Sequence, residues 1–224
     1  MALETSPKGR FQRSLSGALS LYEMYVELRA VRGIGKRGKL DYENEDLLWL
    51  PRSSVVISMS ALDTYVHAVL SDRIPHVLRS HSVPEQLSKL MSSIIPVKDA
   101  KGFSELLPFL KSADPISVIT ERLKENTLAF LSFQAPDKVI NAYELIGHGN
   151  IFQSISDIWQ GPKSTDADIK KSLANYFKRR NQIAHEGDVD HLRNSRPITP
   201  KYAKDCHDFI EGLVGRMHRV VYGG

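Results

Sequence analysis

The segment from Val55 to Leu70 constrains the fold more than any other part of the sequence. It reads VVISMSALDTYVHAVL, and its apolar residues occupy nearly every face of a helix instead of one stripe. A helix that is apolar all round is a buried helix. The β-branched residues between Val55 and Met59 leave a strand open, but the length of the run and its helical spacing favour a helix. We therefore expect a long buried helix that begins near Pro51, a residue suited to a first helical turn.

The rest of the chain also shows the spacing of helices, and an alternation typical of strands is scarce. We predict an all-α fold. Four main helices are expected at 19–32, 51–79, 166–187 and 199–221. Gly187 suits the left-handed end of the third, and Thr199 followed by Pro200 suits the start of the fourth. The stretch 82–161 is interrupted by prolines and glycines, and it predicts an inserted region of short helices at 85–91, 103–110, 116–131, 137–145 and 151–159.

Composition narrows the class of protein. The chain has 224 residues, 42% of them hydrophobic, which is enough for one good core, so we expect a single domain over 19–224 with an insertion at about 82–161. The start, 1–18, is rich in Ser, Lys and Arg and predicts a flexible basic tail that lacks the apolar run of a signal peptide. No stretch reaches the ~18 apolar residues of a membrane span. With a single cysteine, Cys206, a soluble cytoplasmic protein without membrane contact is expected.

Basic residues gather near the end of the third main helix, in the sequence KRRNQIAHEGD. Lys178, Arg179 and Arg180 supply three cations, and His185 adds an imidazole, which can gain and lose a proton near neutral pH. Such a cluster suits phosphate, and a formal charge of +4 is compatible with a polyanionic partner. Alternatively, Lys178 and Arg179 belong to a solvated charged surface, which is the usual place of such a run of charges.

The spacing of these residues has a geometric consequence. At ~100° per residue, Asn181 and His185 share one helix face, whereas Arg180 and His185 diverge by about 140°. Either the long Arg180 side chain reaches round the helix, or a partner chain supplies the complementary group. We expect the second, because one Arg–His pair is a sparse active site and a two-fold axis would double it.

Two segments resemble a known family. RRNQIAHEGD, from Arg179 to Asp188, resembles the Arg-x4–6-His signature of the HEPN superfamily of ribonucleases and nucleotide-binding domains. PRSSVVISMSALDTYVHAVL, from Pro51 to Leu70, is similar to the buried second helix of RiboL-PSP-type HEPN domains, with Asp63 where that helix carries an acidic residue. The order of the helices also agrees.

The resemblance implies a HEPN-like four-helix bundle and a homodimer whose two motifs form one basic cleft. It implies a metal-independent endoribonuclease that cuts single-stranded RNA, acting as a toxin or antiviral defence effector. Arg180, His185, Asn181 and Asp63 are then the catalytic candidates, and Lys178 and Arg179 the candidates for RNA binding. An antitoxin or sensor protein is a further possible partner, a hypothesis that comes from the family alone.

Other interpretations remain open. The alternatives to a nuclease are a non-catalytic HEPN module that binds nucleotides or RNA, and a purely structural dimerisation domain. Asp63 is either a site residue or a buried structural partner, and a pair with Arg180 would satisfy both roles. The histidines outside the motif show no metal-ligand spacing with Cys or acidic residues, so we expect neither a metal nor another cofactor.

Overall fold

The structure, a computed structural model, describes residues 5–35, 40–95, 100–162 and 164–223 and is all-α within them, as the sequence predicts. Two 3-10 helices, η1 (Tyr42–Leu48) and η2 (Leu128–Phe130), accompany the α-helices. The α-helices are α2 (Pro7–Val31), α3 (Trp49–Arg79), α4 (Glu85–Ile94), α5 (Ala100–Leu110), α6 (Pro115–Asn126), α7 (Pro136–Glu144), α8 (Ile151–Ile158), α9 (Asp166–Glu186) and α10 (Pro200–Tyr222). All four main helices and the short helices of 82–161 are present.

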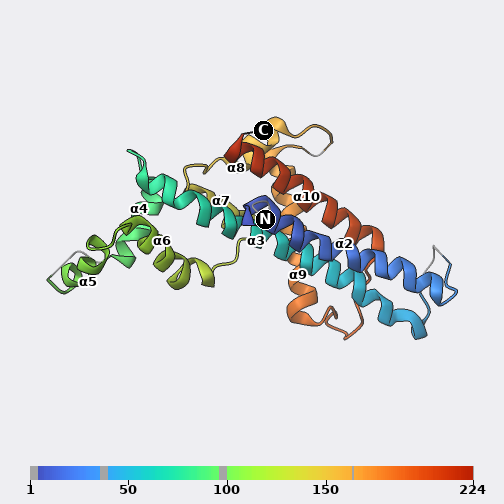
Figure 1. Cartoon of the computed structure of the whole chain (residues 1–224). Coiled ribbons are helices and arrows are strands. Elements are labelled where there is room, and N and C mark those ends of the chain that lie inside the picture. Colours follow the sequence, from blue (N-terminus) through green and yellow to red (C-terminus); the bar gives the residue numbers. More distant parts are fainter. Residues whose placement is uncertain (1–4, 36–39, 96–99, 163, 224) are drawn as a thin grey trace.

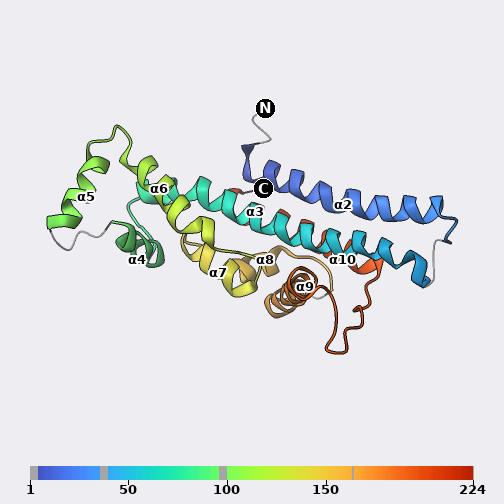
Figure 2. The same ribbon diagram turned by 90° about the horizontal axis from the view of Figure 1, so that it is seen from below.

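Helix α3 forms the centre of the fold, which confirms the prediction made from its apolar run. Val55, Met59, Leu62, Val66 and Val69 are completely buried. Helices α2 and α10 run alongside α3 (Figure 1). Helix α9 is seen end-on in Figure 2 while α2 and α3 cross the view, so α9 crosses the bundle steeply.

In the part of the chain that the structure describes, one segment, Tyr42–Arg79, is long and apolar enough to cross a membrane by length and composition alone. However, 61% of its most apolar window is buried inside the protein. This is the pattern of a core helix.

The prediction of a flexible tail over 1–18 is wrong for residues 7–18, which form the first half of α2. Ser6 caps this helix by accepting a hydrogen bond from the backbone of Gly9 at 3.0 Å. Phe11, Leu15 and Ala18 are buried at intervals of four and three residues. The charged residues between them mask a helical stripe that only its packing on α3 makes evident. Residues 1–4 of the predicted tail lie outside the described residues.

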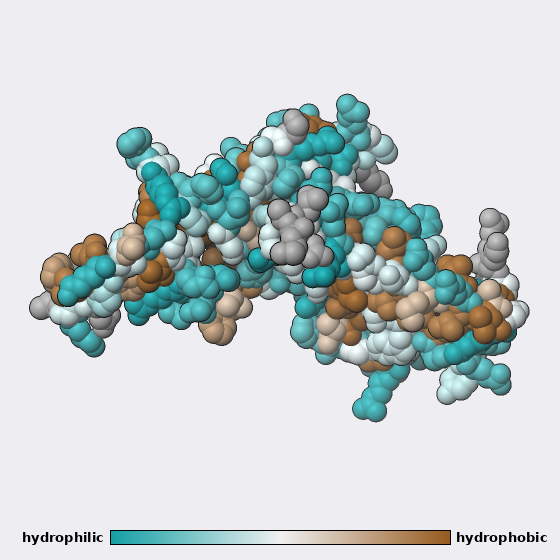
Figure 3. Space-filling view, viewed as in Figure 1, coloured by the Kyte–Doolittle hydropathy of each residue, from teal (hydrophilic) through white to brown (hydrophobic). Residues whose placement is uncertain are grey.

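The inserted region divides between two places. Helices α7 and α8 belong to the main core, where Tyr143, Phe152 and Ile155 are fully buried. Helices α4, α5 and α6 form an arm at the far end of α3, directed away from α2 and α10 (Figure 1). Apolar side chains remain on the surface of this arm (Figure 3), among them Phe103 and Leu110, which are 50% and 57% exposed.

Helix α9 begins and ends with well-defined caps. The Thr165 hydroxyl accepts a hydrogen bond from the backbone of Asp168 at 3.2 Å. At the other end Gly187 adopts a left-handed conformation, φ 63°, as its sequence position predicts. The backbone N–H of Asp188 then donates to the carbonyl of Gln182 at 2.9 Å, which closes the helix end. These caps fix the helix that carries the basic motif.

Candidate functional site

Arg180 and His185 are in direct contact at the end of α9. The Arg180 guanidinium Nη1 lies 3.0 Å from His185 Nε2 and 3.0 Å from the Asn181 side-chain oxygen. Because a guanidinium can only donate hydrogen bonds, the lone pair of His185 Nε2 must be the acceptor. His185 is exposed to solvent, while Arg180 and Asn181 are half-buried.

Of the two arrangements that the sequence left open, this contact is the first, in which Arg180 reaches round the helix, and not the one we expected, in which a partner chain supplies the complementary group. The two Cα–Cβ directions do diverge along the helix, but the long arginine side chain spans the difference. A single chain therefore holds Arg180, Asn181 and His185 together, with one guanidinium nitrogen shared between the amide and the imidazole.

Among the residues that the structure describes, Arg180 has no direct partner of opposite charge. Within the described part of the chain, no carboxylate oxygen lies within ion-pair distance of its guanidinium, and its Nε is buried without a hydrogen-bond partner. Lys178 is exposed and likewise makes no ion pair among the described residues. The end of α9 thus presents unneutralised positive charge beside an imidazole, an arrangement that attracts a phosphate group.

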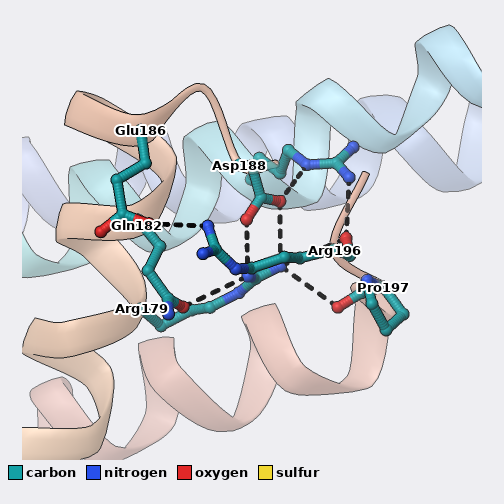
Figure 4. Close-up of polar contacts among 7 residues, drawn as sticks. Arg179, Gln182, Glu186, Asp188, Arg196 and Pro197 are labelled. Atoms are coloured by element: carbon teal, nitrogen blue, oxygen red, sulfur yellow. Dashed lines mark hydrogen bonds and ion pairs between the residues drawn. The ribbon is translucent and has the colours of Figure 1, made fainter. Parts of the chain in front are cut away.

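Arg179 occupies a different environment from its neighbours, which puts its predicted role in RNA binding in doubt. Its guanidinium pairs with both carboxylate oxygens of Asp188, at 2.5 and 2.9 Å, and donates to the carbonyl of Pro197 at 3.1 Å (Figure 4). The side chain is only 11% exposed. These contacts give Arg179 a structural role, since its donors already hold the loop that follows α9.

Asp188 is the residue on which this arrangement depends, and the sequence analysis missed it. Its side chain is 1% exposed, and it pairs with Arg52 of α3 as well as with Arg179. Arg52 Nε lies 2.5 Å from the carboxylate, and Arg52 Nη2 donates to the carbonyl of Arg196 at 3.0 Å. One buried carboxylate therefore joins α3, α9 and the loop between α9 and α10. The sequence feature that could have pointed to Asp188 is an acidic residue directly after a helix-ending glycine and near two arginines.

Asp63 does not pair with Arg180, contrary to the arrangement that would have given it a role in the site. One of its carboxylate oxygens accepts a hydrogen bond from the backbone of Phe133 at 2.5 Å, and the same oxygen lies 4.0 Å from His67 Nε2. His67 in turn contacts the carbonyl of Leu131 at 3.1 Å. Both side chains therefore fasten the 131–133 segment to α3.

Within the described ranges, the structure brings together one group of potential metal ligands that the sequence did not predict. His207, Asp208 and Glu211 of α10 place one ligand atom each within 4.8 Å of one another. Asp208 already pairs with Lys204, and the His207 Nδ1 atom lies 2.9 Å from the Asp208 carboxylate. The group consists of neighbours on one helix, with Asp208 and Glu211 exposed, and we assign no function to it.

The model of the RiboL-PSP-HEPN family matches residues 25–222. This chain is a member of that family. The match contains the helix with Asp63 and the Arg180–His185 motif, so it includes both segments on which the sequence resemblance rested. Neither a curated protein nor a solved structure matches the chain. As a RiboL-PSP-HEPN domain, the protein is a helical module of a type that is generally related to ribonucleases.

Proposed function

We propose that this RiboL-PSP-HEPN domain is a metal-independent endoribonuclease that cleaves single-stranded RNA. The observation that carries the proposal is the pair at the end of α9: an arginine with no carboxylate partner among the described residues, 3.0 Å from an exposed imidazole. A cation and an acid–base group at this distance can act on the same phosphodiester.

In the proposed reaction, an imidazole removes the proton from a ribose 2′-hydroxyl, and the 2′-oxygen attacks the adjacent phosphorus. The bond from phosphorus to the 5′-oxygen of the next nucleotide breaks, and a protonated imidazole gives that oxygen its proton. The products are a 2′,3′-cyclic phosphate and a 5′-hydroxyl. Arg180 stabilises the charge on the phosphorane oxygens, because its planar N–H donors match phosphate geometry.

The Arg180–His185 contact suggests how the substrate starts the reaction. In the free protein the Nε2 lone pair accepts an N–H from Arg180, so this nitrogen is occupied. A phosphate that binds Arg180 competes for the same donor and frees Nε2 to accept the 2′-hydroxyl proton. Asn181, which also binds Arg180 Nη1, keeps the guanidinium near the helix during this exchange.

The reaction needs one base and one acid, whereas the motif of each chain contains one histidine. We therefore propose a homodimer in which each subunit contributes a His185, one as base and one as acid. The dimer has twice the 25.2 kDa mass of the chain. Sedimentation that gives only the monomer at micromolar concentrations would contradict this arrangement.

The variant His185→Ala tests the proposed function. Loss of a general acid–base group lowers such rates by about 100- to 10,000-fold, while the melting temperature should stay unchanged because His185 is exposed. The matched control is His191→Ala, another exposed histidine a few residues further along. Undiminished cleavage by His185→Ala would exclude the mechanism.

The chemistry of the RNA ends provides a second test. Fragments should carry 5′-hydroxyl and cyclic phosphate ends, which block adaptor ligation until the ends are enzymatically repaired. Activity should survive EDTA. Loss of activity on chelation and its recovery with Mg²⁺ would contradict a reaction without metal.

We further propose that the nuclease acts inside the cytoplasm as a toxin or defence effector, restrained by an antitoxin or sensor protein. The support is the family membership of the chain. Expression of the protein alone should arrest growth, and expression of His185→Ala should not. Equal arrest by both proteins would show that RNA cleavage is not its cause.

A further inference from the structure

A cavity of about 600 Å³ lies beside the end of α9, which is within the usual size range of ligand sites. Its walls come from the end of α2, from η1, from the start of α3 and from the loop that follows α9. Gly187, two residues after His185, is part of the wall. The cavity is therefore close in the chain to the proposed catalytic group, yet it is formed largely by other elements.

One wall of the cavity suits a flat base. The Trp49 side chain lines it and is 52% exposed, and the guanidinium of Arg52 lies 5.2 Å from the centre of the Trp49 ring. Tyr25 also lines the cavity but is only 3% exposed, so Trp49 is the ring available to a base. Proteins that recognise single-stranded RNA take up unstacked bases between aromatic rings and guanidinium planes of this kind.

The charged groups in the lining suit the rest of a nucleotide. Arg29, Arg52 and Arg196 bring three guanidinium groups to the lining. Arg52 already holds Asp188 and Arg196 pairs with Glu186, so these groups favour a phosphate through their positive charge and not through free donors. Glu45 and Asp46 contribute two carboxylates. These carboxylates do not favour binding of a phosphate alone, but they can accept hydrogen bonds from a nucleobase that presents N–H donors.

The two carboxylates differ in availability. Both Asp46 oxygens accept hydrogen bonds from Arg32, each at 2.8 Å. The Glu45 side chain is exposed and makes no hydrogen bond or ion pair within the described part of the chain. Two adjacent N–H donors match the two oxygens of a carboxylate, and guanine is the base that presents such a pair on its Watson–Crick edge.

We propose that this cavity binds one unstacked guanine nucleotide of single-stranded RNA beside the bond that is cleaved, and that Glu45 reads the base. This specificity rests on the proposed nuclease function, but binding of the nucleotide does not. Arg52 connects the two sites, because it lines the cavity and also holds Asp188, the residue that fastens the end of α9.

Fluorescence of Trp49 measures binding without any cleavage. The only other tryptophan is Trp159, so Trp159→Phe leaves Trp49 as the sole reporter. In this background GMP should quench the fluorescence in a saturable way and more tightly than AMP, CMP or UMP. Ribose 5-phosphate, which lacks a base, should quench it far less. Absence of saturable quenching by all four nucleotides would overturn the proposal.

Glu45→Gln tests the role in base reading, since it keeps the size of the side chain and removes its charge. It should weaken GMP binding about tenfold and leave AMP binding nearly unchanged. The matched control is Glu43→Gln, which lies on the same short helix but outside the cavity lining. An equal effect of both variants on GMP binding would overturn the assignment of Glu45.

Sequencing of RNA ends then tests the placement beside the cleaved bond. The wild-type protein should cut at a fixed distance from a guanine, and Glu45→Gln should lose this preference. If GMP binds but no RNA is cut, the nuclease proposal fails while the nucleotide site stands. If RNA is cut without preference for guanine, the specificity proposal fails while the nuclease proposal stands.

Discussion

Asp188→Asn tests whether the buried ion pairs, rather than the helix alone, hold the end of α9. The substitution keeps the size of the side chain but removes the negative charge between Arg52 and Arg179, whose side chains are 5% and 11% exposed. Removing one partner from a buried ion pair costs about 3–5 kcal/mol, because the remaining charge stays desolvated. For a chain of this length, that loss lowers the melting temperature by about 6–20 °C.

Thermal unfolding followed by circular dichroism measures this loss, and Glu186→Gln is the matched control. Glu186 also pairs with an arginine, Arg196 at 2.8 Å, and lies close to Asp188 in the chain, but its side chain is 51% exposed. Exposed pairs contribute about 0–1 kcal/mol. The control should therefore lower the melting temperature by less than about 4 °C. Equal losses in the two variants would refute the argument that burial decides the strength of these pairs.

Three further predictions concern single side chains elsewhere. Asp63→Ala should lower the free energy of unfolding by about 1.5–3 kcal/mol, because the hydrogen bond from the Phe133 backbone is lost. Loss of RNA cleavage without loss of stability would instead favour a catalytic role for Asp63. Gly187→Ala should lower the free energy of unfolding, measured by chemical denaturation, by about 1–2 kcal/mol, because the φ of Gly187 is 63°. Its control is Gly215→Ala, within α10 and with open space around it, which should not destabilise the protein. Burial lowers the pKa of His148 and His218 below 6.5, so the unfolded chain binds more protons. The contribution of these two histidines to stability is present above pH 6.5 and is lost as the pH falls toward their folded-state pKa values. The melting temperature of the wild-type protein should therefore fall between pH 7.5 and pH 5.5. The fall should be smaller in the His148→Gln/His218→Gln double variant.

The sequence by itself determined the helices and the ends of several of them. The apolar run of α3 predicted a buried central helix because nearly every face of it needs cover. Thr199 with Pro200, and Gly187, marked helix ends through local chemistry alone. The motif from Arg180 to His185 also lies within a single helix, so the sequence was sufficient to locate it.

The tertiary structure decided what those residues contact. Long side chains are not restricted to the helix face from which they start, and Arg180 therefore reaches His185 within one chain. Neighbours in sequence also separate in space: Arg179 is held by Asp188, while Arg180 has no carboxylate partner among the described residues. The buried stripe that contains Phe11 and Leu15 is recognisable only from its packing against α3. Local patterns determine helices, but ion pairs and cavities join residues far apart in the chain, and only the packing of those helices brings them together.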